Sequence, residues 1–156
     1  MGAHMAHAPF LKLAGALLLL VAAGRPLRAA DPRLVVVANP DSGVDQLSWD
    51  EARNLFLGRQ KRLGSGLPAA PVEQGLPPWI RARFYRLLAA KDVSEIDAYW
   101  SRLIFTGQAH PPRQAPSAEA VIRMVLADRG AVGLLEWEKP DRRVKVVLAF
   151  EGPAGP

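Results

Sequence analysis

The stretch "LVVVANPDSGVDQLSWDEARNLFLGRQKRL", residues 34–63, holds the clearest structural signals in the chain. Residues 34–38 form a short, β-branched apolar run, which the turn-forming residues 39–43 end, and this pattern indicates a buried strand. Ser48 precedes Glu51 by three positions, the spacing of a capping box at a helix start. Apolar residues then recur at helical spacing until Gly58, which can adopt the left-handed conformation that ends a helix. The stretch therefore predicts a strand, a turn and a capped helix.

Further elements follow toward the C-terminus. We expect a strand at 71–74 and a helix from Pro77-Pro78, with its apolar face on Ile80, Phe84, Leu87 and Leu88. A helix over 94–105, capped by Ser94 with Asp97, carries Trp100 on its apolar face, so Trp100 should be buried. Ser117 should cap a fourth helix that Gly130 closes, and strands are expected at 131–135 and 144–150. This order predicts an α/β fold with a small, mostly parallel sheet flanked by helices.

The N-terminus has the features of a removable segment. Residues 1–5 are typical of an expression-vector remnant, and residues 13–24 form an apolar run that is too short to span a bilayer. Small residues follow it, so we interpret residues 1–30 as remnant and signal peptide, cleaved between Arg25 and Asp31. The alternatives are a buried core helix and a lipid-held anchor. Residues 31–156 then form one domain, exported to the periplasm.

Composition limits the classes of function. The chain has 156 residues, about half of them apolar, which suits one folded domain. Of its 20 basic residues 17 follow residue 30, as do all 15 acidic ones, so the domain has a net charge of only about +2. The arginines are scattered among acids and form no stripe, which argues against a nucleic-acid partner. The absence of cysteine excludes disulfides, thiolate metal sites and a cysteine nucleophile.

Residues for catalysis are scarce. His110 is the one histidine after residue 30, and its neighbour Pro111 places it in a surface loop. The sequence Gly64-Ser65-Gly66 lacks the third glycine and the helix of a dinucleotide-binding motif. Glu136 and Glu138 alternate along a strand and should face solvent. We therefore predict no enzyme, no cofactor and no metal site.

Anion binding is the remaining chemical option. Arg59, Lys61 and Arg62 follow the predicted C-terminus of the first helix, where cations interact favourably with the helix dipole. The same residues could bind an anion, helped by backbone amides of Ser42 and Gly43 in the turn after the first strand. Both interpretations remain open, although the dipole alone accounts for the basic residues.

Five segments in order, from about Leu34 to Leu148, resemble the phosphate ABC-transporter substrate-binding proteins, which have the periplasmic binding protein type II fold. The segments are residues 34–63, "PVEQ", "RARFYRLL", "AYWSRLIFTG" and "RGAVGLLE". The first contains a helix that ends in Phe-Leu-Gly, the fourth a tryptophan helix before Phe-x-Gly, and the fifth a Gly-Ala-Val-Gly-Leu strand. The resemblance implies a solute-binding fold with phosphate as ligand.

The chain departs from this family in two ways. Family members have two lobes that close on phosphate, and this chain has residues for one. The family's phosphate loop has an arginine followed by a Ser-Gly-Thr helix start. Gln74 lies near the arginine position here, and Pro78-Trp79-Ile80 replaces the helix start, without hydroxyls and with one amide donor fewer.

We therefore expect an exported, single-lobe solute-binding module for a phosphate-like anion, associated with ABC transport or periplasmic sensing, whose phosphate site is degraded. Its expected ligand-binding residues are Ser42, Gly43, Arg59, Lys61, Arg62 and Gln74. Its expected partners are inorganic phosphate or another small anion, bound weakly, a membrane transporter or sensor protein, and a second copy in a homodimer. The alternative is a protein-interaction module that has the same fold and binds no ligand.

Overall fold

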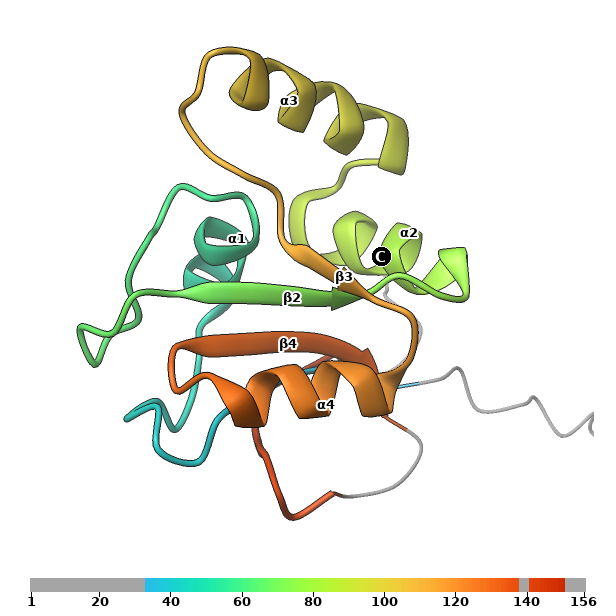
Figure 1. Ribbon diagram of the computed structural model, residues 1–156. Helices are drawn as coiled ribbons and strands as arrows, with labels where there is room; N and C mark the ends of the chain where they lie inside the picture. Colours follow the sequence, from blue (N-terminus) through green and yellow to red (C-terminus); the bar gives the residue numbers. More distant parts are fainter. Residues whose placement is uncertain (1–32, 138–140, 151–156) are drawn as a thin grey trace, which may run out of the picture.

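A computed structural model describes residues 33–137 and 141–150. The predicted remnant and signal peptide, residues 1–30, lie outside this range. The elements in chain order are β1 (Leu34–Ala38), α1 (Trp49–Phe56), β2 (Ala70–Gln74), α2 (Pro78–Ala89), α3 (Val93–Phe105), β3 (Arg113–Ala115), α4 (Ala118–Ala127), β4 (Ala131–Glu136) and β5 (Lys145–Phe150). They form a five-stranded sheet with helices on both faces (Figure 1).

The strand order in the sheet is β3-β2-β4-β1-β5. Strand β2 is parallel to both β3 and β4, whereas β1 is antiparallel to its two neighbours, β4 and β5. Four strands therefore run in one direction, and β1, next to the edge strand β5, runs against them. The sheet is mostly parallel, as predicted, with one reversed strand inside it.

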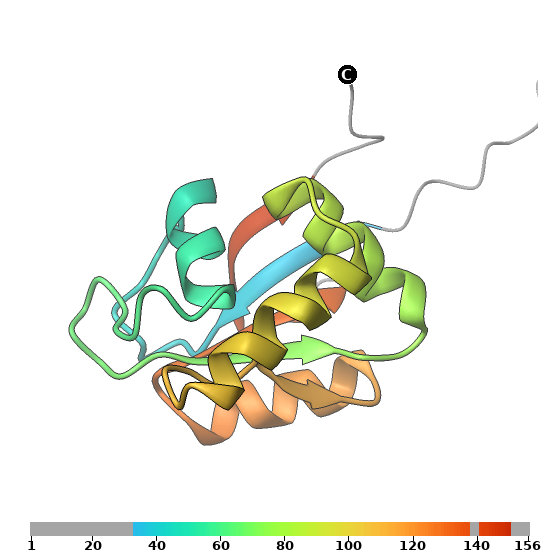
Figure 2. The ribbon, with the colours of Figure 1, turned by 90° about the horizontal axis from the view of Figure 1, so that it is seen from above.

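Strand β1 separates two apolar cores. Leu34, Val36 and Ala38 pack with α1, α2 and α3, while Val35 and Val37 pack with α4 on the other face. Because successive side chains of a strand point to opposite faces, burial on both faces explains the uninterrupted apolar run. The layers are visible from two directions, with α3 outermost and α4 on the far side of the sheet (Figures 1 and 2).

Helix α1 begins and ends as predicted. The Ser48 hydroxyl accepts a hydrogen bond from the Glu51 backbone N–H, and the Glu51 carboxylate accepts one from the Ser48 backbone N–H. Gly58 follows the helix with a φ of +67°. A side chain there would also meet the Trp100 ring, whose Cη2 lies 2.8 Å from the position of a Cβ. Glycine is therefore required at this turn for both its conformation and its size.

The capping box gives a first test of this local structure. Replacing Ser48 with alanine leaves backbone donors of the first turn without a partner, and should lower the free energy of unfolding by about 1 kcal/mol. Urea denaturation measures this change. Ser65→Ala, in an exposed loop, is the matched control and should change stability by less than about 0.5 kcal/mol. Equal losses in the two variants would contradict the capping role.

Helix α2 starts at Pro78, as the proline pair predicts, with Pro77 as its N-cap. Ile80, Phe84 and Leu88 are buried against the sheet, and the partly buried Leu87 packs beside them. The predicted apolar face is therefore confirmed.

Helix α3 starts earlier than predicted. Its N-cap is Asp92, which accepts a hydrogen bond from the Glu95 backbone and forms a full capping box with that residue. The predicted pair of Ser94 and Asp97 is wrong, because Ser94 lies inside the helix and its hydroxyl donates to Asp92. Trp100 is buried as predicted, with 3% of its surface exposed.

The segment after α3 contains a strand that we did not predict. Strand β3 has three residues, two of them exposed, so no apolar run marks it. Ser117 caps α4 as predicted, but the helix ends at Ala127 rather than at Gly130. Gly130 instead packs against the Pro68 carbonyl, which leaves no room for a side chain. The last two strands lie within one residue of their predicted bounds.

Candidate functional site

A buried polar cluster lies where β2 meets α2. Glu73 of β2 has only 1% of its surface exposed, and its carboxylate accepts three hydrogen bonds. The donors are Arg81 Nε at 2.8 Å, the Tyr85 hydroxyl at 2.9 Å and Gln114 Nε2 at 3.2 Å. One carboxylate therefore ties together β2, α2 and β3.

Burial and charge set the titration of this cluster. Burial raises the pKa of Glu73 above its ordinary value, and the positive charge of Arg81 is the largest opposing influence. Burial, together with the neighbouring carboxylate, also raises the pKa of Tyr85 well above its ordinary value. Arg81 forms a second ion pair with Asp97 of α3 at 2.8 Å. Because Arg81 is paired with two carboxylates of the protein, Glu73 and Asp97, its charge serves the structure rather than a ligand.

Gln74, the next residue of β2, points to the opposite face of the sheet. Its Oε1 accepts from the Glu136 backbone N–H at 2.9 Å, and its Nε2 donates to the Leu76 carbonyl at 2.7 Å. Both ends of the amide are therefore bound within the protein. Gln74 also lines a pocket of about 380 Å³, together with three carboxylate residues, Glu119, Glu136 and Asp141. An anion in this pocket would meet acidic side chains, which opposes its binding.

The start of α2 offers few donors to an anion. Pro77 and Pro78 have no N–H, and the N–H of Ile80 already donates to the Pro77 carbonyl at 3.1 Å. The N-terminus of a helix binds anions through its free backbone N–H groups. Among the first three residues of α2, only Trp79 has a backbone N–H that is free to bind an anion.

Ser42 and Gly43 lie at the other end of the sheet from Gln74. Strand β1 is antiparallel to β4, and its last residue, Ala38, pairs with Val132 of β4. Val132 also pairs with Pro71, near the start of β2. Ala38 therefore lies at the end of the sheet where β2 begins. The turn that follows β1 is therefore more than about 10 Å from the end of β2. Ser42 is buried, and its hydroxyl accepts from the Val44 backbone N–H at 3.2 Å. Gly43 has a φ of +71° and lies against Ser65.

The three basic residues after α1 contact different parts of the protein. Arg62 donates to the Gly66 carbonyl at 2.8 Å, and Lys61 to the Gln108 carbonyl at 3.4 Å. Arg59 lines a separate pocket beside Leu57. Neither of the two side-chain hydrogen bonds is made to a carbonyl at the end of α1. The structure thus does not bring these residues and Gln74 to one point.

The polar cluster was not predicted from the sequence. Two signals were available: an acidic residue, Glu73, inside an expected strand, and Arg81 eight positions later on the next expected helix. Two other predictions are confirmed: His110 is exposed in the connection between α3 and β3, and Gly64-Ser65-Gly66 is a loop. Glu136, which we expected to face solvent, is instead half-buried at the end of β4 and lines the pocket beside Gln74. Glu138 lies outside the described residues.

Within residues 33–137 and 141–150, no three histidine, aspartate or glutamate side chains are grouped so that they could hold a metal ion. No helix in these ranges has the length and apolarity needed to cross a membrane.

Comparisons with known proteins indicate a fold relationship. The sequence matches no protein-family model, and a search of curated proteins finds no match. Two solved structures are similar, each over 76% of this chain with a TM-score of 0.60. One, 12% identical, is assigned as a phosphate ABC transporter substrate-binding protein with bound phosphate, from Clostridium perfringens. The other, 19% identical, is an ABC-type phosphate transport receptor from Vibrio cholerae.

This chain spans only about half of each of those proteins, 45% and 46% of their lengths. Its sheet and helices correspond to a single lobe of that fold. The predicted fold class is therefore confirmed, and the likeness at these low identities concerns the fold alone.

Proposed function

We propose that this chain is an exported, non-catalytic module of the solute-binding type, which takes part in ABC transport or periplasmic sensing of a small anion. The observation that carries the proposal is the likeness of 76% of this chain to about half of each of two proteins of phosphate transport. Fold does not by itself fix function, so the site must support the ligand.

The geometry at the end of β2 argues that phosphate binds weakly there. A desolvated phosphate needs many charge-assisted hydrogen bonds. The amide of Gln74 is occupied, α2 begins with two prolines, and the adjacent pocket is lined by acidic residues. The module therefore retains the fold and has lost most of the donors for this ligand.

Calorimetry with inorganic phosphate tests the proposal. We expect a Kd of roughly 1 mM or weaker, about −4 kcal/mol. The double variant Pro78→Ser, Trp79→Gly adds a hydroxyl and a backbone N–H at the start of α2, and should tighten binding about tenfold. Micromolar binding by the natural sequence would overturn the claim of a degraded site.

A triple variant, Arg59→Ala, Lys61→Ala, Arg62→Ala, locates any weak binding that is observed. If phosphate binding survives in this variant, the basic residues after α1 are not its site. If binding disappears, phosphate is held at the end of the sheet where β2 begins, rather than beside Gln74.

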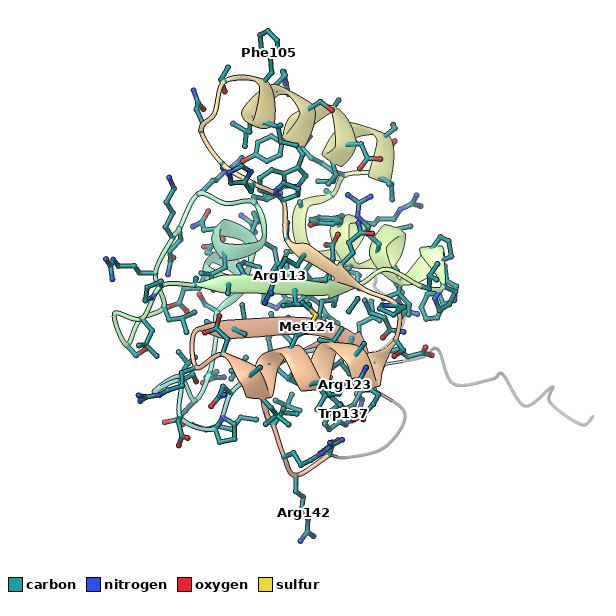
Figure 3. All side chains as sticks on the ribbon, in the orientation of Figure 1. Phe105, Arg113, Arg123, Met124, Trp137 and Arg142 are labelled. Carbon is teal, nitrogen blue, oxygen red and sulfur yellow. The ribbon has the colours of Figure 1, made fainter. Side chains whose placement is uncertain are left out.

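A second candidate function is a protein-interaction module, which a set of exposed apolar side chains favours. Phe105 ends α3 with 93% of its surface exposed and points away from the body of the protein (Figure 3). Leu76 and Trp79 are exposed at the turn between β2 and α2. Two solute-binding lobes in a dimer, or one lobe on a transporter, would cover such residues. Analytical ultracentrifugation separates these cases, since a monomer excludes the homodimer.

A further inference from the structure

A pocket of about 440 Å³ lies between two loops at the start of β2. One wall is the segment that leaves α1, with Gly58 and Lys61, and the other is the connection from α3 to β3, with Gln108 and His110. Leu55 of α1 and Pro71 of β2 also line it. The volume is in the range of small-molecule sites. The pocket is distinct from the β2–α2 turn, where the resemblance places phosphate.

Hydrogen bonds outside the pocket hold its walls in place. The Tyr99 hydroxyl of α3 donates to the Leu57 carbonyl at 2.6 Å, which ties α3 to the end of α1. The Ala69 N–H donates to the Lys61 carbonyl at 2.9 Å and fixes the loop after α1 to the strand. Trp100 packs against Gly58 behind the same wall. The pocket is therefore formed before a ligand arrives, which reduces the entropic cost of binding.

The lining of this pocket contains basic side chains and no acidic ones. Lys61 and His110 are its basic side chains, and no aspartate or glutamate lines it. Within residues 33–137 and 141–150, Lys61 pairs with no carboxylate, and its amine makes one long hydrogen bond, 3.4 Å to the Gln108 carbonyl. An ammonium group can donate three hydrogen bonds. Lys61 thus retains donors for a ligand that lies on the half-buried apolar surface of Ala69, Pro71 and Ala109.

We propose that this pocket binds a small organic anion, with its carboxylate or phosphate group on Lys61 and its apolar body against Ala69 and Pro71. Inorganic phosphate has no such body and should gain little here. This inference goes beyond the proposed function, because it places an organic anion at the start of β2 rather than phosphate at the end of β2. Lys61 is the one residue that it shares with the predicted phosphate ligands.

Calorimetry with matched probes tests both parts of the ligand. Benzoate and phenyl phosphate carry an anionic group on an aromatic body, benzamide has the body without the charge, and inorganic phosphate has the charge without the body. We expect at least one organic anion to bind about tenfold more tightly than either benzamide or inorganic phosphate. The tighter of the two organic anions identifies the preferred group. Failure of both to bind, or equal binding of benzamide or of inorganic phosphate, would overturn the proposal.

Three variants locate the binding. Lys61→Gln removes the positive charge, and Gln108→Glu places a carboxylate opposite Lys61. Each variant should therefore bind the organic anion about tenfold more weakly. Arg142→Gln removes an exposed cation that does not line this pocket and should leave the affinity unchanged. All of these side chains are exposed, so the variants should fold, which thermal melts confirm. An affinity that survives both Lys61→Gln and Gln108→Glu, or that falls equally in Arg142→Gln, would place the anion elsewhere.

Discussion

Replacing Arg81 with methionine is expected to lower the free energy of unfolding by about 3–5 kcal/mol at neutral pH. Methionine retains an apolar stem and removes the cation that pairs with Glu73 at 2.8 Å. Glu73 is buried, and the arginine side chain itself is only 14% exposed, so solvent cannot replace the lost partner. The loss arises because a buried carboxylate is left without its counter-charge.

The pH dependence of this loss is a second readout. Arg81 is the largest influence that holds the pKa of Glu73 down, so its removal raises that pKa further. A carboxyl group with a raised pKa in the folded state binds more protons folded than unfolded, and stability then falls as the pH rises. The difference between Arg81→Met and the natural sequence should therefore be largest near pH 8 and shrink toward pH 5.

The double variant Glu73→Gln, Arg81→Met is the control for charge. Glutamine can still accept the Tyr85 hydroxyl, and no charge remains to be buried. We expect this variant to recover at least half of the lost stability and to lose the pH dependence. Urea denaturation at several pH values gives both results. A loss under about 1 kcal/mol in Arg81→Met would mean that solvent reaches Glu73.

Replacing Trp100 with alanine should cost about 3–5 kcal/mol. The indole lies between α3 and the loop after α1, where it contacts Gly58 and packs edge-on against Tyr99 at a centroid distance of 5.2 Å. Its removal leaves a cavity that the rigid glycine turn cannot fill. Among the residues that the structure describes, the buried indole N–H has no acceptor in hydrogen-bonding geometry, so part of the loss is offset when this group is removed.

Phe105→Ala on the same helix is the matched control for Trp100. This ring is almost fully exposed, so its loss should change stability by less than about 0.5 kcal/mol. Both variants are measured by urea denaturation with far-ultraviolet circular dichroism. A loss under about 1 kcal/mol in Trp100→Ala would show that α3 contributes little to the core.

The features that the sequence predicted correctly are those with local causes. The capping box of Ser48, the proline start of α2 and the apolar run of β1 each depend on residues close together in the chain. Strand β3 was missed because its pairing with β2 is set by position in the sheet and not by its own composition. The cap of α3 was misplaced by two residues because Asp92 and Ser94 are both good capping residues.

The candidate site was predictable only in part, because it depends on strand direction. If β1 were parallel to β2, the turn with Ser42 and Gly43 would lie at the same end of the sheet as Gln74. Because β1 is reversed, they lie at opposite ends of the sheet. Nothing in the five residues of β1 indicates in which direction the strand runs. Pairing of Glu73 with Gln114 also required β3, which the sequence did not reveal.

The position of β1 between β4 and β5 has a consequence for the order in which the protein can fold. Among the described strands, β1 is synthesised first, and it pairs on both sides with the last two, Leu34 with Glu136 and with Phe150. The helices that cover its two faces precede β4 in the chain, but both hydrogen-bonding edges of β1 lack their partners until β4 and β5 have been synthesised. The sheet of residues 33–150 can therefore close only after its last strand, β5, has been synthesised, which makes its formation dependent on contacts between distant parts of the chain.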